Sequence, residues 1–214
     1  TRPDSGAVER RPTSGRSVAY LPQRPEFRPG LTVEQTLRFY GGLVEGPVDV
    51  EASLERVGLL DARERRVEAL SGGMVRLLGF AQALVGNPPF VVLDEPSSGL
   101  DPNLADQMFH LAEGLARDGR GVLLASHDLA AVEETADEVC LLADGVFRAR
   151  GSPSEVVAGA DDATSLRAAF RSLVGHPARR DVGEDDGTDG ESEERADGDG
   201  EVTAESPDAE PAEI

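Results

Sequence analysis

Two adjacent carboxylates, Asp94 and Glu95, follow the apolar run of residues 90–93. Such a run is typical of a strand buried on both faces, and charges at its end cost free energy unless a positive group lies nearby. Since the chain has no lysine, Mg²⁺ with phosphate ligands is the natural partner, because it prefers one or two carboxylates plus waters and phosphate oxygens. Adjacent strand residues face opposite sides, so one carboxylate could hold the metal while the other addresses a water molecule. A pair that is merely solvated at a loop end explains the same residues.

A second candidate site is the turn Ser71-Gly72-Gly73, directly before a predicted helix. The glycines allow close approach of a ligand to the backbone, and the helix N-terminus offers N–H donors and a favourable dipole to an anion. An ordinary serine N-cap followed by glycines in a turn is the alternative interpretation.

Two further polar residues follow predicted strands. His127, in Ser126-His127-Asp128, could donate to a phosphate oxygen, although a lone histidine is often structural. Gln23, after Leu21-Pro22, could ligate a metal or orient a water molecule; alone, a loop glutamine is uninformative.

The apolar periodicity alternates between that of strands and that of helices. Asp101-Pro102 supplies an N-cap and a proline at the first helical position, Thr32 and Gln35 have the spacing of a capping box, and Asp144-Gly145 predicts a hairpin turn. Strands are predicted at 17–21, 90–93, 121–125, 139–142 and 146–149, and helices at about 33–44, 54–60, 77–85, 102–115 and 129–136. This order predicts an α/β fold with a parallel sheet covered on both sides and ligands at the carboxyl ends of its strands.

The composition excludes several classes of protein. The 214 residues carry a formal net charge of −20 and all 21 basic residues are arginine, which opposes nucleic acid or anionic lipid as an electrostatic partner. The single cysteine, Cys140, excludes an internal disulfide, and no apolar run approaches the ~20 residues of a transmembrane helix. Residues 181–214 hold 15 acidic residues and one arginine, so we expect an acidic disordered tail. Arginine-only basicity with excess acid suggests a salt-rich cytoplasm of haloarchaeal type.

Taken in order, these motifs resemble the ATP-binding cassette of ABC transporters over about residues 1–173. The matching segments are Leu21-Pro22-Gln23 for the Q-loop, Leu70-Ser71-Gly72-Gly73 for the signature, Val91-Val92-Leu93-Asp94-Glu95-Pro96 for Walker B, Ser98-Gly99-Leu100-Asp101 for the D-loop and Ser126-His127 for the H-loop.

The resemblance implies a role for each matching residue. Asp94 would hold Mg²⁺ through water, Glu95 would be the general base for the attacking water, and His127 would contact the γ-phosphate of ATP. Gln23 would sense the metal and the attacking water. The signature residues Ser71, Gly72 and Gly73 would complete the ATP site of a second cassette in trans, with Asp101 lining the same dimer seam.

The resemblance also implies partners and an organisation of the chain. The partners would be an integral membrane permease and a second cassette, in a homo- or heterodimer at the cytoplasmic face of the cell membrane. The implied divisions are 1–29 for a core remnant with the Q-loop, 30–87 for a helical subdomain ending in the signature helix, 88–173 for the Walker B, D-loop and H-loop core, and 174–214 for the tail.

The P-loop of the family has no counterpart. There is no G-x-x-x-x-G-K-[ST] sequence, and Thr1–Val8 looks like the stretch that follows the P-loop helix. We therefore expect a P-loop NTPase-type core that lacks its N-terminal strand, P-loop and first helix, as in a truncated reading frame, with part of the sheet exposed. Met74-Val75-Arg76-Leu77 also departs from the family, where glutamine and arginine are usual.

Three alternatives remain open. A DNA-repair ABC ATPase has a very long insertion between Q-loop and signature, whereas Gln23 and Ser71 are only 48 positions apart. A soluble translation-type ABC protein has two cassettes in one chain, and a single signature is present. A degenerate, non-catalytic cassette would supply Ser71–Gly73 to its partner, although Glu95 and His127 are retained.

Overall fold

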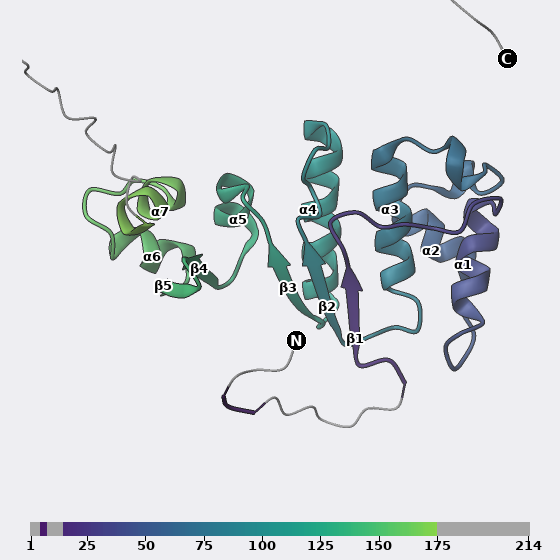
Figure 1. The fold of residues 1–214 in the computed structure, drawn as a ribbon, viewed down its shortest axis with the longest axis horizontal. Coiled ribbons are helices and arrows are strands. Elements are labelled where there is room, and N and C mark those ends of the chain that lie inside the picture. The colour runs from purple at the N-terminus through teal and green to yellow at the C-terminus, as the bar shows by residue number, and fades with distance from the viewer. Residues whose placement is uncertain (1–4, 8–14, 175–214) are drawn as a thin grey trace, which may run out of the picture. The chain divides into compact units, whose positions relative to one another are not determined.

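A three-stranded parallel sheet lies at the centre of the computed structural model (Figure 1). Its strands are β1 (Val18–Leu21), β2 (Phe90–Asp94) and β3 (Gly121–Ala125), in the order β1-β2-β3. The structure describes residues 5–7 and 15–174, all within one compact unit, Thr1–Pro177. Because Leu21 pairs with Leu93, and Asp94 with Ala125, the carboxyl ends of the strands lie at one edge of the sheet.

Four α-helices accompany this sheet, and their caps follow from the local sequence. Thr32 and Gln35 form the predicted capping box at the first helix, and the Asp101 side chain accepts from the Leu104 amide at the fourth. The helices are α1 (Val33–Gly41), α2 (Val50–Arg56), α3 (Gly72–Ala83) and α4 (Pro102–Arg117), with 3₁₀ turns at Leu60–Ala62 and Val67–Ala69.

The rest of the described chain forms a hairpin with three short helices. Asp144 and Gly145 both have positive φ, 52° and 74°, as the predicted hairpin turn requires. The elements are α5 (Leu129–Thr135), β4 (Val139–Ala143), β5 (Val146–Gly151), α6 (Pro153–Ala158) and α7 (Leu166–Val174).

Two hydrophobic clusters hold these elements together. The larger joins β1, β2 and the helices α1–α4 around fully buried side chains such as Leu21, Phe80 and Leu93. A Cβ on Gly79 would lie 2.9 Å from side-chain atoms of Leu21 and Pro25, so glycine allows α3 to pack closely against β1 and the segment after it. The smaller cluster packs β4 against α6 and α7.

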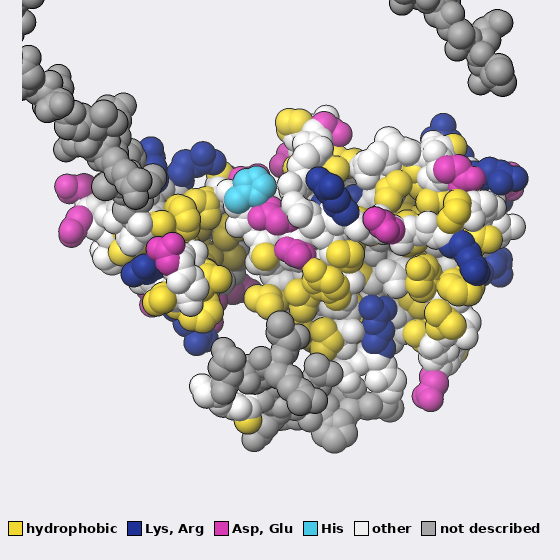
Figure 2. Space-filling view, in the orientation of Figure 1, with side chains coloured by type: hydrophobic (Ala, Val, Ile, Leu, Met, Phe, Trp, Pro, Cys, Tyr) yellow, Lys and Arg dark blue, Asp and Glu magenta, His cyan; other side chains and the backbone are white. Residues whose placement is uncertain are grey.

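Among the described residues the sheet is buried on one face only, so the prediction of strands buried on both faces is wrong, whereas the expectation that part of the sheet is exposed is met. On one face Ala19, Val91 and Leu93 are fully buried. The pairing puts alternate residues on the other face, where hydrophobic side chains gather in the space-filling view (Figure 2). Its exposed members are Val18 at 45%, Tyr20 at 49%, Phe90 at 38% and Leu123 at 57%.

The strand at 139–143 does not extend the parallel sheet. β4 pairs antiparallel with β5, and no described strand pairs with the second edge of β3. The predicted hairpin across the Asp144-Gly145 turn is thus confirmed. The predicted tail lies outside the described residues except for Val174, as does most of the segment 1–8. None of the described helices has the length and apolarity needed to span a bilayer.

Candidate functional site

The two strand-end carboxylates and the histidine meet at the carboxyl edge of the sheet. Asp94 is the last residue of β2, Glu95 follows it, and His127 follows β3 after one residue. His127 Nδ1 lies 2.7 Å from Glu95 Oε2, with the Glu95 side chain 23% exposed and the His127 side chain 74% exposed. An imidazole held on a half-buried carboxylate, open to solvent on its other side, is an arrangement that can orient a proton acceptor.

Glu95 leaves the strand in a left-handed backbone conformation, with φ of 47°. This region costs a non-glycine residue ~1–2 kcal/mol, so neighbouring groups must stabilise it. The Glu95 N–H donates to the Ala125 carbonyl at 2.9 Å, which ties the residue to the end of β3. The turn at Glu95 thus takes its carboxylate off the regular alternation of β2 and toward His127.

Asp94 has a hydrogen-bond partner that the sequence did not reveal. The Tyr20 hydroxyl donates to Asp94 Oδ2 at 2.9 Å, because Tyr20 pairs with Val92 and so shares a face with Asp94 two residues on. This hydrogen bond, then desolvation and the charge of Asp94, raises the pKa of Tyr20. The sequence offered only a tyrosine three positions before Gln23, and the pairing of β1 with β2 is needed to connect it with Asp94.

The signature turn and Asp101 line a common cavity of about 310 Å³. Ser71 caps α3 by accepting from the Met74 N–H at 3.2 Å, and the Asp101 carboxylate accepts from the Leu104 N–H at 3.1 Å. Gly73 faces Leu104 so closely that an added Cβ would clash with its side chain. Both N-caps are therefore structural as well as cavity-lining, so the ordinary N-cap interpretation of Ser71 holds alongside any ligand role.

Arg76 connects this cavity to Glu95, at the carboxyl ends of the strands. It is 9% exposed, lies one turn into α3, and donates through Nη1 to the carbonyls of Glu95 at 2.7 Å and Pro96 at 3.1 Å. Burial, and after it the charge of Arg24, lowers the pKa of Arg76. From the sequence, residues 74–77 were expected only to depart from the family pattern; the signal for Arg76 was that it is the one charged residue between Ser71 and Asn87.

Gln23 follows β1 at the same end of the sheet as Asp94 and Glu95, but it forms no hydrogen bond with the other predicted site residues. It is exposed, and the described part of the chain offers its side chain no hydrogen-bond partner. No cluster of three His, Cys, Asp or Glu side chains suited to a metal occurs within residues 5–7 and 15–174. Asp94 and Glu95 alone therefore fit a hard cation only if waters and ligand oxygens complete its shell, as Mg²⁺ accepts.

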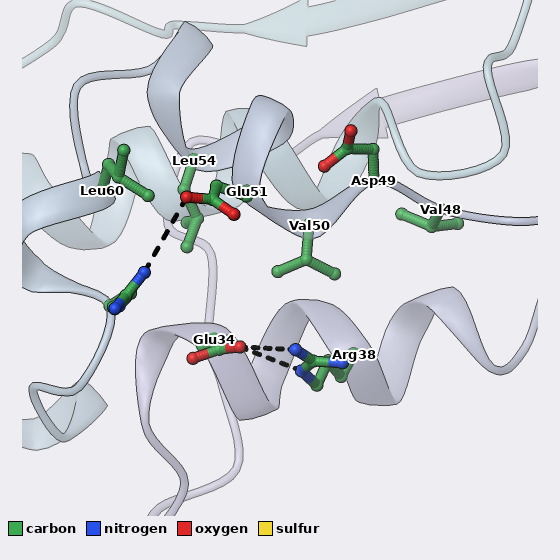
Figure 3. Close-up of a pocket in the computed structure, with 9 residues that line it drawn as sticks. Glu34, Arg38, Val48, Asp49, Val50, Glu51, Leu54 and Leu60 are labelled. Atoms are coloured by element: carbon green, nitrogen blue, oxygen red, sulfur yellow. Dashed lines mark hydrogen bonds and ion pairs between the residues drawn. The ribbon is translucent and has the colours of Figure 1, made fainter.

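Another cavity lies among the helices between residues 34 and 63, away from these residues. Its volume is about 220 Å³, and Figure 3 shows the ion pair of Arg38 with Glu34 that lines it. The distance of this pair is 2.6 Å, and a second pair joins Arg63 to Glu51 at 3.9 Å. Four of its charged side chains are thus paired with one another, and the fifth, Asp49, accepts a hydrogen bond from the Ala52 N–H at 3.0 Å as the N-cap of α2.

Comparison with known proteins identifies the kind of domain that this chain carries. Residues 1–98 match the family described as ABC transporter. The chain carries an ABC transporter ATP-binding domain. It is 35% identical over 178 residues to the zinc import ATP-binding protein ZnuC of Paracoccus denitrificans, a match that covers 82% of this chain and 65% of that protein.

Other relatives agree with this assignment. The Nod factor export ATP-binding protein I of Burkholderia thailandensis is 32% identical over 170 residues, which cover 73% of this chain and 56% of that one. A solved structure of an ATP-binding subunit of an ABC transporter has a TM-score of 0.65 at 25% identity, covering 74% of this chain and 69% of that one. The predicted α/β fold with a parallel sheet is thus confirmed, and the matches to this chain span 65% and 56% of the length of these two curated relatives.

Proposed function

We propose that this chain is the ATP-binding and hydrolysing subunit of an ABC transporter, with ATP and Mg²⁺ as substrate and metal. The observation that carries the proposal is the Glu95–His127 contact of 2.7 Å at the carboxyl edge of the sheet. This contact supports Glu95 as a general base that His127 holds in place. His127 is open to solvent on its other side, where a nucleotide can approach. Phosphoryl transfer to water needs little more from the protein than positioning and charge stabilisation.

Each residue has a role in this proposal. Glu95 accepts the proton of the attacking water, and His127 orients Glu95 and reaches the γ-phosphate from the exposed end of its ring. Asp94, held by Tyr20, holds Mg²⁺ through water, and Gln23 approaches this region when nucleotide is bound. Mg²⁺, when bound, offsets negative charge on the phosphates. Ser71, Gly72 and Gly73 offer backbone N–H groups and a hydroxyl to the nucleotide of a second cassette, next to Asp101.

The proposal extends to partners. A second cassette and an integral membrane permease complete the assembly, at the cytoplasmic face of the membrane, with no role for nucleic acid. The named relatives include one zinc importer and one Nod factor exporter, so these matches support neither a direction of transport nor a cargo.

The decisive experiment measures ATP turnover by the full-length product of the gene with Mg²⁺. We expect Glu95→Gln to lower kcat about 10²–10⁴-fold, because the amide cannot accept the proton. Glu113→Gln is the matched control; this residue pairs with Arg117 on α4 and should leave kcat unchanged. Turnover by Glu95→Gln equal to that of the wild type would contradict the proposal.

A second candidate is a non-catalytic cassette that supplies only its signature turn. It is favoured by one observation, that the 214 residues contain neither a lysine nor a P-loop sequence. By themselves, these residues should show negligible ATPase activity. The same Glu95→Gln variant distinguishes the two candidates when full-length protein is mixed with its partner cassette, because a non-catalytic cassette does not depend on Glu95.

A further inference from the structure

We propose that Arg76 is a positioning residue for Glu95, and that it couples the signature helix to the catalytic carboxylate of the same chain. The inference rests on the proposed function, since it assigns to Arg76 the control of a residue that we place in ATP hydrolysis. It is carried by the burial of Arg76 and by the three carbonyl groups that this side chain holds.

The three carbonyl groups belong to one short segment. Arg76 Nη1 donates to Glu95 O at 2.7 Å and to Pro96 O at 3.1 Å, and Nη2 lies 3.4 Å from Ser98 O. The Ser98 N–H also donates to Glu95 O, at 3.2 Å. The peptide that leaves Glu95 is therefore fixed by the guanidinium and by its own turn, while the peptide that enters it is fixed by Ala125.

The guanidinium has no carboxylate partner in the part of the chain that the structure describes, although the chain is strongly acidic. A buried charge needs strong hydrogen bonds in place of water, and charge-assisted bonds to carbonyl oxygens supply them. Arg76 reaches the three carbonyls through two nitrogens of its planar fork, Nη1 and Nη2, whereas lysine would have to serve them from a single ammonium nitrogen. The site is thus built for arginine and for the backbone of Glu95–Ser98.

The backbone of Glu95, which Arg76 holds, has an unusual conformation. Glu95 has a φ of 47°, and in this conformation its carboxylate lies 2.7 Å from His127 Nδ1. Release of the Glu95 carbonyl lets the residue return to the extended region that non-glycine residues prefer. The carboxylate then loses its place beside His127, and a displacement of about 1 Å in a reacting group can cost about 10²-fold in rate.

The same side chain connects two sites. Arg76 lies one turn after Ser71, the N-cap of α3, and lines the cavity of the signature turn. When a nucleotide of the second cassette engages Ser71–Gly73, any shift of α3 acts directly on the carbonyl of Glu95. Arg76 thereby makes the catalytic geometry of one ATP site depend on occupancy of the other.

The test compares three variants in the full-length protein with its partner cassette. Arg76→Met, which removes every donor, should lower kcat about 10–100-fold with little change in the KM for ATP. Arg76→Lys, which keeps a charge and some donors, should recover part of kcat and serves as the test if Arg76→Met does not fold. Arg16→Met is the matched control, because Arg16 likewise donates to two carbonyls, Val18 O and Ala83 O, each at 3.2 Å.

Arg16 joins the far end of α3 to β1, so its loss should lower Tm as the loss of Arg76 does, yet leave kcat unchanged. Equal loss of kcat in Arg16→Met and Arg76→Met would show a merely structural role and overturn the proposal. Wild-type kcat in a folded Arg76→Met protein would overturn it too.

A readout without ATP keeps the inference separate from the proposed function. In the 214-residue chain, hydrogen exchange at the Ser98 amide should be faster in Arg76→Met than in the wild type, and unchanged in Arg16→Met. Unchanged exchange at Ser98 in Arg76→Met would overturn the positioning role. If the wild type hydrolyses no ATP, or Glu95→Gln hydrolyses it normally, the proposed function fails instead, while the exchange result still reports on Arg76.

Discussion

The two glycines of the signature turn lie in different surroundings. A Cβ on Gly73 would clash with the Leu104 side chain of α4, whereas nothing lies within 4 Å of a Cβ on Gly72. We expect Gly73→Ala to lower the free energy of unfolding by ~1–3 kcal/mol through overpacking. Gly72→Ala should leave it unchanged or raise it by up to ~1 kcal/mol, since alanine is the better helix residue. Urea denaturation of both variants measures the difference.

The pair also separates packing from ligand approach. If both alanine variants are equally stable, the close packing of Gly73 on Leu104 is not a constraint. A second outcome is that Gly72→Ala is stable and yet no longer stimulates the ATPase of its partner cassette. That result would show that position 72 needs glycine for contact with the ligand and not for packing.

Some residues of the candidate site could be predicted from the sequence, and others could not. Asp94, Glu95 and His127 were predicted at strand ends, because an apolar run followed by polar residues is a local pattern. The left-handed turn at Glu95 could not be predicted from its residue type, because it depends on Ala125 and Arg76, which are 30 and 19 positions away. Tyr20 reaches Asp94 only through the pairing of β1 with β2, which the sequence does not specify.

At the scale of elements, α3 packs on β1 through Gly79. The proline and leucine atoms that a Cβ would meet, at 2.9 Å, include the rigid ring of Pro25. Gly79→Ala should therefore push α3 from β1 and lower the free energy of unfolding by ~1–3 kcal/mol. Gly114→Ala in α4 is the control: nothing lies within 4 Å of its Cβ, so a gain of ~0.5–1 kcal/mol is expected. Equal stability of the two variants would contradict this account.

The capping boxes of α1 and α6 make the same reciprocal hydrogen bonds, but only the one at α6 contains a titratable side chain. At α1 the reciprocal residue is Gln35, and at α6 it is Glu155. Hydrogen bonds from the Ser152 N–H and then from its hydroxyl lower the pKa of Glu155. A lowered folded-state pKa contributes stability that is present above the unfolded-state value and is lost as pH falls through the folded-state value.

The Ser152 cap should therefore weaken in acid while the Thr32 cap does not. We expect the Tm of Glu155→Gln to fall less than that of the wild type between pH 6 and pH 3, because the amide accepts the same N–H at any pH. Thermal unfolding followed at each pH measures the two slopes. Parallel slopes would show that Glu155 makes no pH-dependent contribution.

The elements with local signals were predicted, and those that depend on distant partners were not. Asp101, Pro102 and the capping box at Thr32 fixed the starts of α4 and α1, and the Asp144-Gly145 turn predicted the hairpin. The exposure of Leu123 could not be assigned from its own strand, because the apolar run at 121–125 reads the same whether one face of the sheet is covered or both. Phe90 of the central strand is exposed on the same face, so the uncovered face and not the strand position explains it.

At the scale of the whole chain, excess negative charge dominates the electrostatic interactions. The net charge of −20 favours repulsion within the folded state. Attraction between paired side chains offsets little of it, since pairs such as Arg38–Glu34 and Arg117–Glu113 are largely exposed on the arginine side, and such pairs contribute ~0–1 kcal/mol each. Residues 181–214 hold −14 of the total.

Salt should therefore stabilise this chain. The Debye length falls from ~10 Å at 0.1 M to ~3 Å at 1 M salt, which screens the many repulsions more than it weakens the few exposed ion pairs. We expect Tm to rise steadily from 0.1 M to 1 M KCl, and to rise less in a chain ended after residue 180, whose net charge is −6. Calorimetry at low protein concentration measures both curves. A Tm that falls with KCl would mean that the ion pairs, not the excess carboxylates, dominate the electrostatic free energy of folding.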